Sequence, residues 1–147
     1  MRRFLILAIA LATFAAAPAF AAEKAGDPGT NVPMPFLIAP MSKDGKLLGY
    51  AYISSKLVAS SERAAHEISD KIVFIQDAFV RDVNAASIAT GADPTIADPR
   101  LLADRLVADA RRVVGSTKVA RIIFGDGDKD GGIVFSPLHQ TKTPEKP

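Results

Sequence analysis

Two stretches rich in apolar, aromatic and β-branched residues open the folded part of the chain, and this composition is typical of strands. They cover residues 36–39 and 47–58. The dipeptide Asp44-Gly45 lies between them and predicts a two-residue hairpin, because both turn positions need a positive φ. The two stretches are therefore predicted to pair as antiparallel strands.

The second strand of this hairpin carries two tyrosines. Tyr50 and Tyr52 share one face, and Ala51 and Ile53 share the other, because side chains alternate along a strand. Pro40 removes a backbone donor late in the first strand. That strand is therefore predicted to lie at a sheet edge or to end there.

After Ser60 the spacing of apolar residues changes to about 3.6, as an amphipathic helix requires. Ser60 or Ser61 can cap the first turn, and Gly91 is predicted to end the helix. Further apolar residues widen the stripe, so we expect the helix to be covered on more than one side. The stripe is Ile68, Ile72, Ile75, Phe79 and Val83, and Val73, Phe74 and Val80 widen it.

A second helix is predicted from Asp98-Pro99 to Gly115, because Asp is a good N-cap, Pro suits the first helical position and Gly ends helices. Strands at 119–124 and 133–135 follow it. The order β-β-α-α-β-β predicts an α+β fold, with two helices packed on one face of a mainly antiparallel sheet.

The predicted domain covers residues 36–139 of the 147-residue chain. Residues 22–35 are rich in Gly and Pro and are interpreted as a flexible linker. Residues 140–147 are polar and are interpreted as a disordered tail.

The first 21 residues have the pattern of a secretory signal peptide. Arg2 and Arg3 precede an apolar core, and small residues at two candidate cleavage sites follow Pro18. The alternative is a retained anchor, because the stretch from Phe4 to Ala22 has no charge and is long enough to span a bilayer. We expect export by the general secretory route and cleavage.

The net charge of the chain falls once the leader, with its two arginines, is removed. The full chain has a net charge of +2, whereas a chain that begins at Ala22 has 16 basic and 16 acidic residues. Nucleic-acid binding through a basic surface is therefore not expected. The chain has no cysteine, so disulfides, thiolate metal sites and cysteine nucleophiles are excluded.

One segment has a spacing that suggests metal binding. Asp126, Asp128 and Asp130, with Gly131 next, match the first half of an EF-hand calcium loop. Pro137 stands where the closing Glu should be. The alternative is a solvated hairpin loop, because Asp and Gly also favour turns.

No catalytic motif is recognisable, so we expect a protein that is not an enzyme and has no cofactor apart from the calcium alternative. His66 and His139 are interpreted as surface residues. Contact with other proteins is assigned to exposed parts of aromatic and apolar side chains, because aromatic residues are enriched at interfaces. These candidates are Phe74, Val80, Tyr50 and Tyr52, with the polar residues Asp77 and Arg81 beside them on the first helix.

The arrangement resembles the periplasmic domain of the FliL family of flagellar basal-body-associated proteins. The resemblance covers residues 35–124 and rests on the early strand at 34–38, the helix segment 75–80 and the closing strand at 119–124. It implies a stomatin-like fold, a periplasmic location, self-association beside the inner membrane and stator-type partners. The loop between the helices, residues 92–95, departs from the family pattern of an acidic residue with Gly.

Two functional hypotheses follow. The first is an exported, non-enzymatic FliL-like module that acts through protein contacts near the inner membrane, as a homo-oligomer and as an accessory of the flagellar motor. The alternative is a soluble periplasmic ligand-binding or calcium-binding protein that uses the loop from Asp126 to Asp130.

Overall fold

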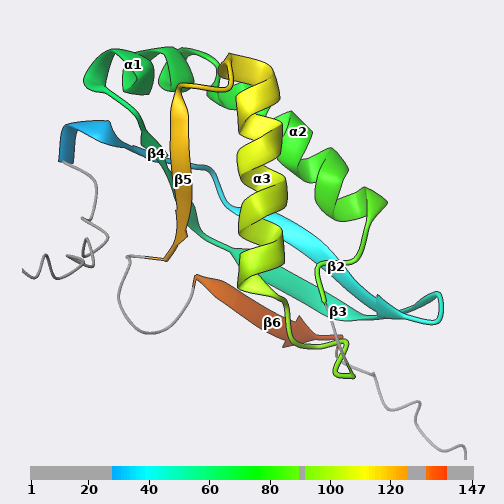
Figure 1. Cartoon of the computed structure of the whole chain (residues 1–147). Helices are drawn as coiled ribbons and strands as arrows, with labels where there is room; N and C mark the ends of the chain where they lie inside the picture. The colour runs from blue at the N-terminus through cyan, green and yellow to red at the C-terminus, as the bar shows by residue number, and fades with distance from the viewer. Residues whose placement is uncertain (1–27, 90–91, 126–131, 139–147) are drawn as a thin grey trace, which may run out of the picture.

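The computed structural model describes residues 28–89, 92–125 and 132–138 (Figure 1). The predicted signal peptide and the predicted tail lie outside these residues. The elements in chain order are η1 (Pro28–Thr30), β1 (Asn31–Pro33), β2 (Leu37–Lys43), β3 (Lys46–Ile53), β4 (Ser55–Ala59), α1 (Glu62–Asp70), α2 (Ile72–Ala85), α3 (Pro99–Val114), β5 (Val119–Phe124) and β6 (Ile133–Pro137).

The strands form two three-stranded antiparallel sheets, with the orders β1-β4-β5 and β2-β3-β6. Only Ser54 separates β3 from β4. The amide of Ser54 donates to the carbonyl of Gly132 (2.6 Å), and its carbonyl accepts from the amide of Gly125 (2.9 Å). The predicted α+β class is confirmed, but the predicted single sheet is divided in two at Ser54.

The β2–β3 hairpin forms as predicted. Asp44 and Gly45 have φ values of 50° and 76°, which are the positive angles that the two-residue turn needs. β2 is the terminal strand of its sheet, so Pro40 lies in an edge strand, where a missing backbone donor is tolerated.

The first predicted helix is in fact two helices, α1 and α2, so the described chain has three helices rather than two. Ser61 caps α1 through its Oγ, which accepts from the amide of Ala64 at 3.1 Å. The helical path breaks at Lys71, whose ψ of 13° lies outside the helical range. The expected end at Gly91 was wrong, because α2 stops at Ala85.

The predicted limits of α3 are confirmed. Asp98 is its N-cap, and one carboxylate oxygen accepts from the amides of Arg100 (2.9 Å) and Leu101 (3.0 Å). Pro99 occupies the first turn, and Gly115 is the C-cap with a φ of 113°. A non-glycine residue would be strained at that angle, so the glycine fixes where the helix ends.

The predicted linker extends too far into the domain. Asn31–Pro33 pairs with β4, and the amide of Met34 donates to the carbonyl of Ser55 at 2.9 Å. Val32 and Met34 are buried. Local composition favoured a linker, but pairing with β4 supplies backbone partners that the segment lacks alone.

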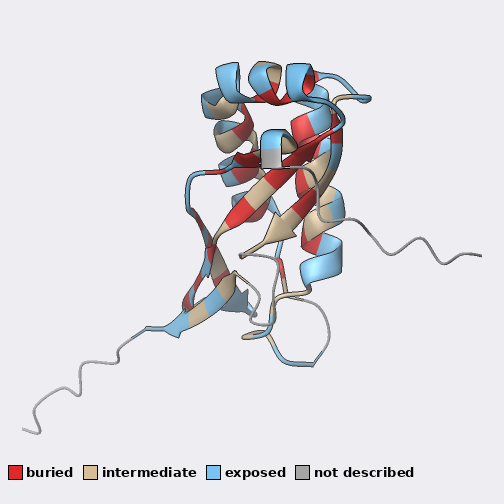
Figure 2. Cartoon of the chain, turned by 90° about the vertical axis from the view of Figure 1, so that its left-hand side faces the viewer, coloured by how far each residue is buried: buried red, intermediate tan, exposed pale blue. Residues whose placement is uncertain are grey.

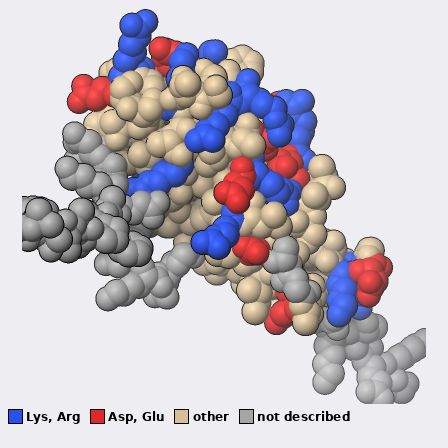
Figure 3. Space-filling view, viewed as in Figure 1, with Lys and Arg blue, Asp and Glu red and all other residues tan. Residues whose placement is uncertain are grey.

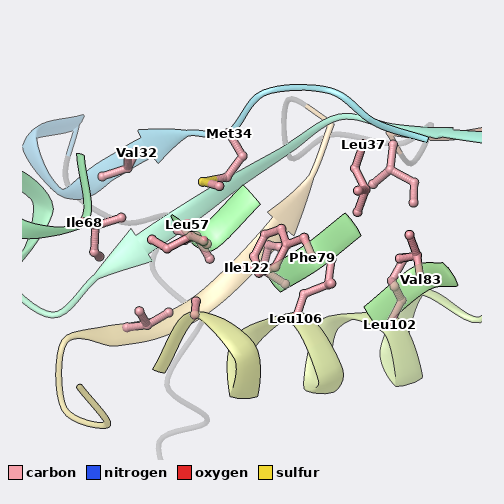
Figure 4. Packing of buried hydrophobic residues seen from close by; sticks show 14 of the residues in the cluster. Val32, Met34, Leu37, Leu57, Ile68, Phe79, Val83, Leu102, Leu106 and Ile122 are labelled. Atoms are coloured by element: carbon pink, nitrogen blue, oxygen red, sulfur yellow. The ribbon is translucent and has the colours of Figure 1, made fainter. Parts of the chain in front are cut away.

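The hydrophobic core lies between the helices and the inner faces of both sheets. Figure 2 shows buried residues where the helices face the strands, and exposed residues on the outward sides. In Figure 4, Leu37 and Leu57 from the strands point toward Phe79 of α2 and Leu106 of α3. All three helices contribute buried residues to this cluster, so they cover one side of the strands.

Candidate interaction surface

The outer face of the β2-β3-β6 sheet carries a row of exposed apolar side chains. Along β3, Ala51 and Ile53 point into the core, and the alternating residue Tyr52 points outward. Tyr52 is opposite Ile38 of β2 and Val134 of β6 in the strand register. The three side chains therefore form one row across the whole sheet, on the side away from the helices.

This outer-face row, Ile38–Tyr52–Val134, is open in the monomer. The exposed fractions are 48% for Ile38, 44% for Tyr52 and 63% for Val134. Tyr50, which is two residues before Tyr52, is exposed on the same face and lies opposite Pro40 and Ser136 in the register. Contiguous exposed apolar residues of this kind are typical of contact surfaces between proteins.

The shared face of Tyr50 and Tyr52 is confirmed by the strand register. Ile38 and Val134 belong to the same surface but were not among the residues predicted for it. Alternation within each strand could have placed them on an outer face. Only the pairing of β2 and β6 with β3 brings them beside Tyr52, and sequence spacing does not contain this pairing.

Phe74 and Val80 of α2 do not join this surface. They are exposed by 66% and 42%, on a helix that packs against the opposite side of the sheet. Six residues separate them, which places them about 120° apart around the helix axis. The expectation that this helix is covered on more than one side was wrong, because Val73 and Phe74 are exposed as well.

Asp77 and Arg81 form a salt bridge with each other on the exposed side of α2. The two side chains are separated by one helical turn and are largely solvated, and such pairs contribute only a few tenths of a kcal/mol, about 0.3–0.5. The structure therefore gives this pair no contact with Tyr50 or Tyr52, and the six candidate residues do not form one site.

Asp82 of α2 has a different role from its neighbours. Its carboxylate accepts from Arg105 of α3 at 2.8 and 3.0 Å. The same guanidinium donates to the carbonyls of Asp82, Ala86 and Ser87. The carbonyl of Asp82 also accepts from the amide of Ala86, whereas the carbonyls of Ala86 and Ser87 lie beyond the last helical residue. Arg105 thus binds carbonyls at the C-terminal end of α2, which stops at Ala85, before the predicted Gly91.

Asp109 is the buried acid of the α2–α3 contact. Its side chain is 4% exposed, and Oδ1 accepts from Arg112 Nη1 at 2.7 Å. Oδ2 has no hydrogen-bond partner among the described residues. Burial, with a smaller contribution from the charge of Asp82, raises the pKa of Asp109 despite the opposing effects of Arg112 and Arg105.

Two surface carboxylates have the opposite shift. The hydrogen bond from Lys118 lowers the pKa of Glu67 and joins α1 to the start of β5. The side-chain hydrogen bond from Thr95, at 2.6 Å, lowers the pKa of Asp93 in the loop before α3. The first bond joins two segments that are distant in the chain, whereas the second lies within one loop.

The candidate calcium ligands Asp126, Asp128 and Asp130 lie outside the described residues. The structure does place the two ends of their segment, because Gly125 and Gly132 both hydrogen-bond to Ser54. Within the described ranges, no group of three or more acidic or histidine side chains could hold a metal ion.

The two histidines and the membrane-spanning alternative remain to be placed. His66 is exposed on α1, and His139 lies outside the described residues. Among the described residues, no helix has the length and hydropathy that crossing a bilayer would require.

No protein-family model matches the chain, and no curated protein matches it.

Proposed function

We propose that this protein is an exported, non-enzymatic module that self-associates through the outer face of its β2-β3-β6 sheet. The observation that carries the proposal is the outer-face row, Ile38–Tyr52–Val134, which is apolar and exposed although it runs across all three strands. Aromatic residues add large contact area at low entropic cost, so Tyr50 and Tyr52 are the central contacts.

The resemblance to the FliL family supports a cellular location and a class of partner for this module. The resemblance implies a module in the periplasm beside the inner membrane, with stator-type proteins as partners. The mature chain would begin near Ala22, and the intact mass of the native protein checks this start. A retained leader would instead tether the same domain to the membrane.

The test is a pair of double variants of the mature chain. Tyr52→Ser with Val134→Ser removes two members of the row and is expected to weaken self-association by at least about tenfold, because the buried contact loses its largest apolar groups. Light scattering after size-exclusion chromatography measures the molar mass over a range of concentrations.

The matched control is Phe74→Ser with Val80→Ser. These residues are also exposed and apolar, but they lie on α2. Self-association should be unchanged in this variant. A wild-type chain that stays monomeric at every concentration, or equal loss in both double variants, would reject the outer face as the contact.

A second candidate function is calcium binding by Asp126, Asp128 and Asp130. Ser54 supports it, because its amide and carbonyl bind Gly132 and Gly125 and so hold the two ends of the loop together. A pre-closed loop lowers the entropic cost of gathering the ligands.

Excess calcium should then raise the melting temperature of the mature chain, because a ligand that binds only the folded state stabilises it. Asp128→Asn should remove this rise, and magnesium serves as the ion control. A melting temperature that calcium does not change would exclude a calcium site of useful affinity.

A further inference from the structure

We propose that the groove between α3 and β5 binds an extended acidic segment of a partner protein, which adds to the free edge of β5 as a further strand. This surface is separate from the outer-face row, so the proposal goes beyond self-association and can stand or fall independently of it. In Figure 1, α3 and β5 lie side by side, and their residues are in contact.

β5 is the terminal strand of its sheet, since the order is β1-β4-β5. The amide of Gly125 donates to the carbonyl of Ser54, so the backbone groups of Gly125 point toward the β4 side of the strand. Because backbone groups alternate in direction along a strand, those of Ile122 and Phe124 point away from β4, toward the free edge of β5. No strand within the described ranges pairs with that edge, so its donors and acceptors can bind an added strand.

A groove of about 530 Å³ runs along this edge. Its apolar lining comes from small and medium side chains of both elements, Ala103, Val107, Ala120 and Ile122. A strand that docks on β5 directs every second side chain to one face, and this lining leaves room there for residues such as Val. Backbone bonds would supply affinity, and the lining would select the alternate side chains.

The charge of the groove favours an acidic segment. Three arginines line it, Arg111, Arg112 and Arg121, against one carboxylate, Asp104. Arg112 also pairs with the buried Asp109, but its own side chain remains 75% exposed. Figure 3 shows basic side chains on the face that α3 and β5 share, with acidic side chains among them. Acidic side chains on the outward positions of a docked strand would meet these guanidinium groups.

Arg111 limits which residues of β5 an added strand can pair with. Its guanidinium donates to the carbonyls of Val119 (3.0 Å) and Ala120 (3.2 Å), which lie at the start of β5. These acceptors are therefore already satisfied, as is common where a charged side chain protects an exposed edge. An added strand would pair with Ile122 and Phe124, so the bound segment is short.

The experiment uses the mature chain and a fluorescein-labelled peptide, Val-Glu-Val-Glu-Val-Glu, in a fluorescence anisotropy titration at low ionic strength. We expect saturable binding with a dissociation constant below about 1 mM. A peptide with Lys in place of each Glu tests the charge. A peptide with Pro in place of the central Val tests strand addition, because Pro removes a backbone donor. Both control peptides should bind at least about tenfold more weakly.

Two variants of the protein locate the site. Ala108→Glu adds a negative charge to the exposed flank of α3 that lines the groove, and it should weaken binding of the acidic peptide by about fivefold to tenfold. Ala85→Glu makes the same exchange at an exposed helical position outside the groove and should leave the affinity unchanged.

Backbone amide shifts in nuclear magnetic resonance spectra supply the deciding readout. Peptide addition should move the amide signals of Ile122 and Phe124 more than those of β2. The proposal is overturned if the acidic peptide does not bind, if the Lys or Pro peptide binds equally well, or if the shifts fall elsewhere. The double variant Tyr52→Ser and Val134→Ser should still bind the peptide, which separates this site from the self-association face.

Discussion

At the scale of single residues, the contact between α2 and α3 contains two charged side chains, Arg105 and Asp109, whose hydrogen bonding differs. All three nitrogens of the Arg105 guanidinium donate hydrogen bonds, to the Asp82 carboxylate and to carbonyls at the end of α2. Asp109 has one oxygen paired with Arg112 and one without a partner among the described residues. A buried carboxylate in this state favours its neutral form, because burial penalises the charge.

Asp109 should therefore make the protein less stable as the pH rises. Because its pKa is raised in the folded state, the folded chain binds the proton more tightly than the unfolded chain. This contribution to stability is complete below the unfolded pKa of about 4 and is lost as the pH rises through the folded pKa. Asp109→Asn should raise the free energy of unfolding at pH 7 by about 1 kcal/mol, with little change near pH 4.

Urea denaturation at a series of pH values measures this difference. The groups that face Asp109 are Asp82, Arg105 and Arg112, and they are retained in the variant. Asp104→Asn is the control, because it makes the same exchange at an exposed position of α3. Parallel stability curves for Asp109→Asn and the wild type would show that Asp109 does not titrate in this range.

At the scale of elements, the caps and turns were predictable because each is set by a few adjacent residues. Ser61, Asp98, Gly115 and the Asp44-Gly45 turn all act where the sequence placed them. The break at Lys71 was not predictable from periodicity, because apolar residues continue at helical spacing across it. The end of α2 was missed for a different reason: its C-cap is Ala86, and the side chain that binds the carbonyls there, Arg105, lies on another helix.

β1 is the element whose stability contribution is most open to test. A chain that begins at Phe36, the predicted start of the domain, lacks β1 and the buried side chains of Val32 and Met34. Its free energy of unfolding should be lower by about 4 kcal/mol than that of a chain that begins at Pro28, because burying each such side chain contributes about 1.5–3 kcal/mol.

Urea denaturation of the two chains checks this expectation. Pro33→Ser in the longer chain changes an exposed residue of β1 and should alter stability by less than about 0.5 kcal/mol. Equal stability of the two chains would mean that β1 adds nothing to the core and that the boundary predicted from composition is adequate.

At the scale of the whole molecule, each of three stretches of chain gives one strand to each sheet, as the pairs β1 and β2, β3 and β4, and β5 and β6. The stretches pass from one sheet to the other between Pro33 and Leu37, at Ser54, and between Phe124 and Ile133. One side of the strands is covered by the helices, and the outer-face row remains on the other. The β5 edge beside α3 is a second surface that the described residues leave open. The proposed self-association and the proposed peptide binding therefore concern two separate surfaces of the molecule.

The α+β class, the hairpin, the caps of α1 and α3 and the shared face of Tyr50 and Tyr52 are all set by local sequence. Each depends on residues that are close together in the chain, so propensity and periodicity suffice. Tertiary structure alone decided that Ile38 and Val134 join Tyr52, that Phe74 and Val80 lie apart from it, and that α3 forms a groove with β5. These relations join segments distant in the chain, and strand pairing and helix packing fix them through contacts that local sequence does not encode.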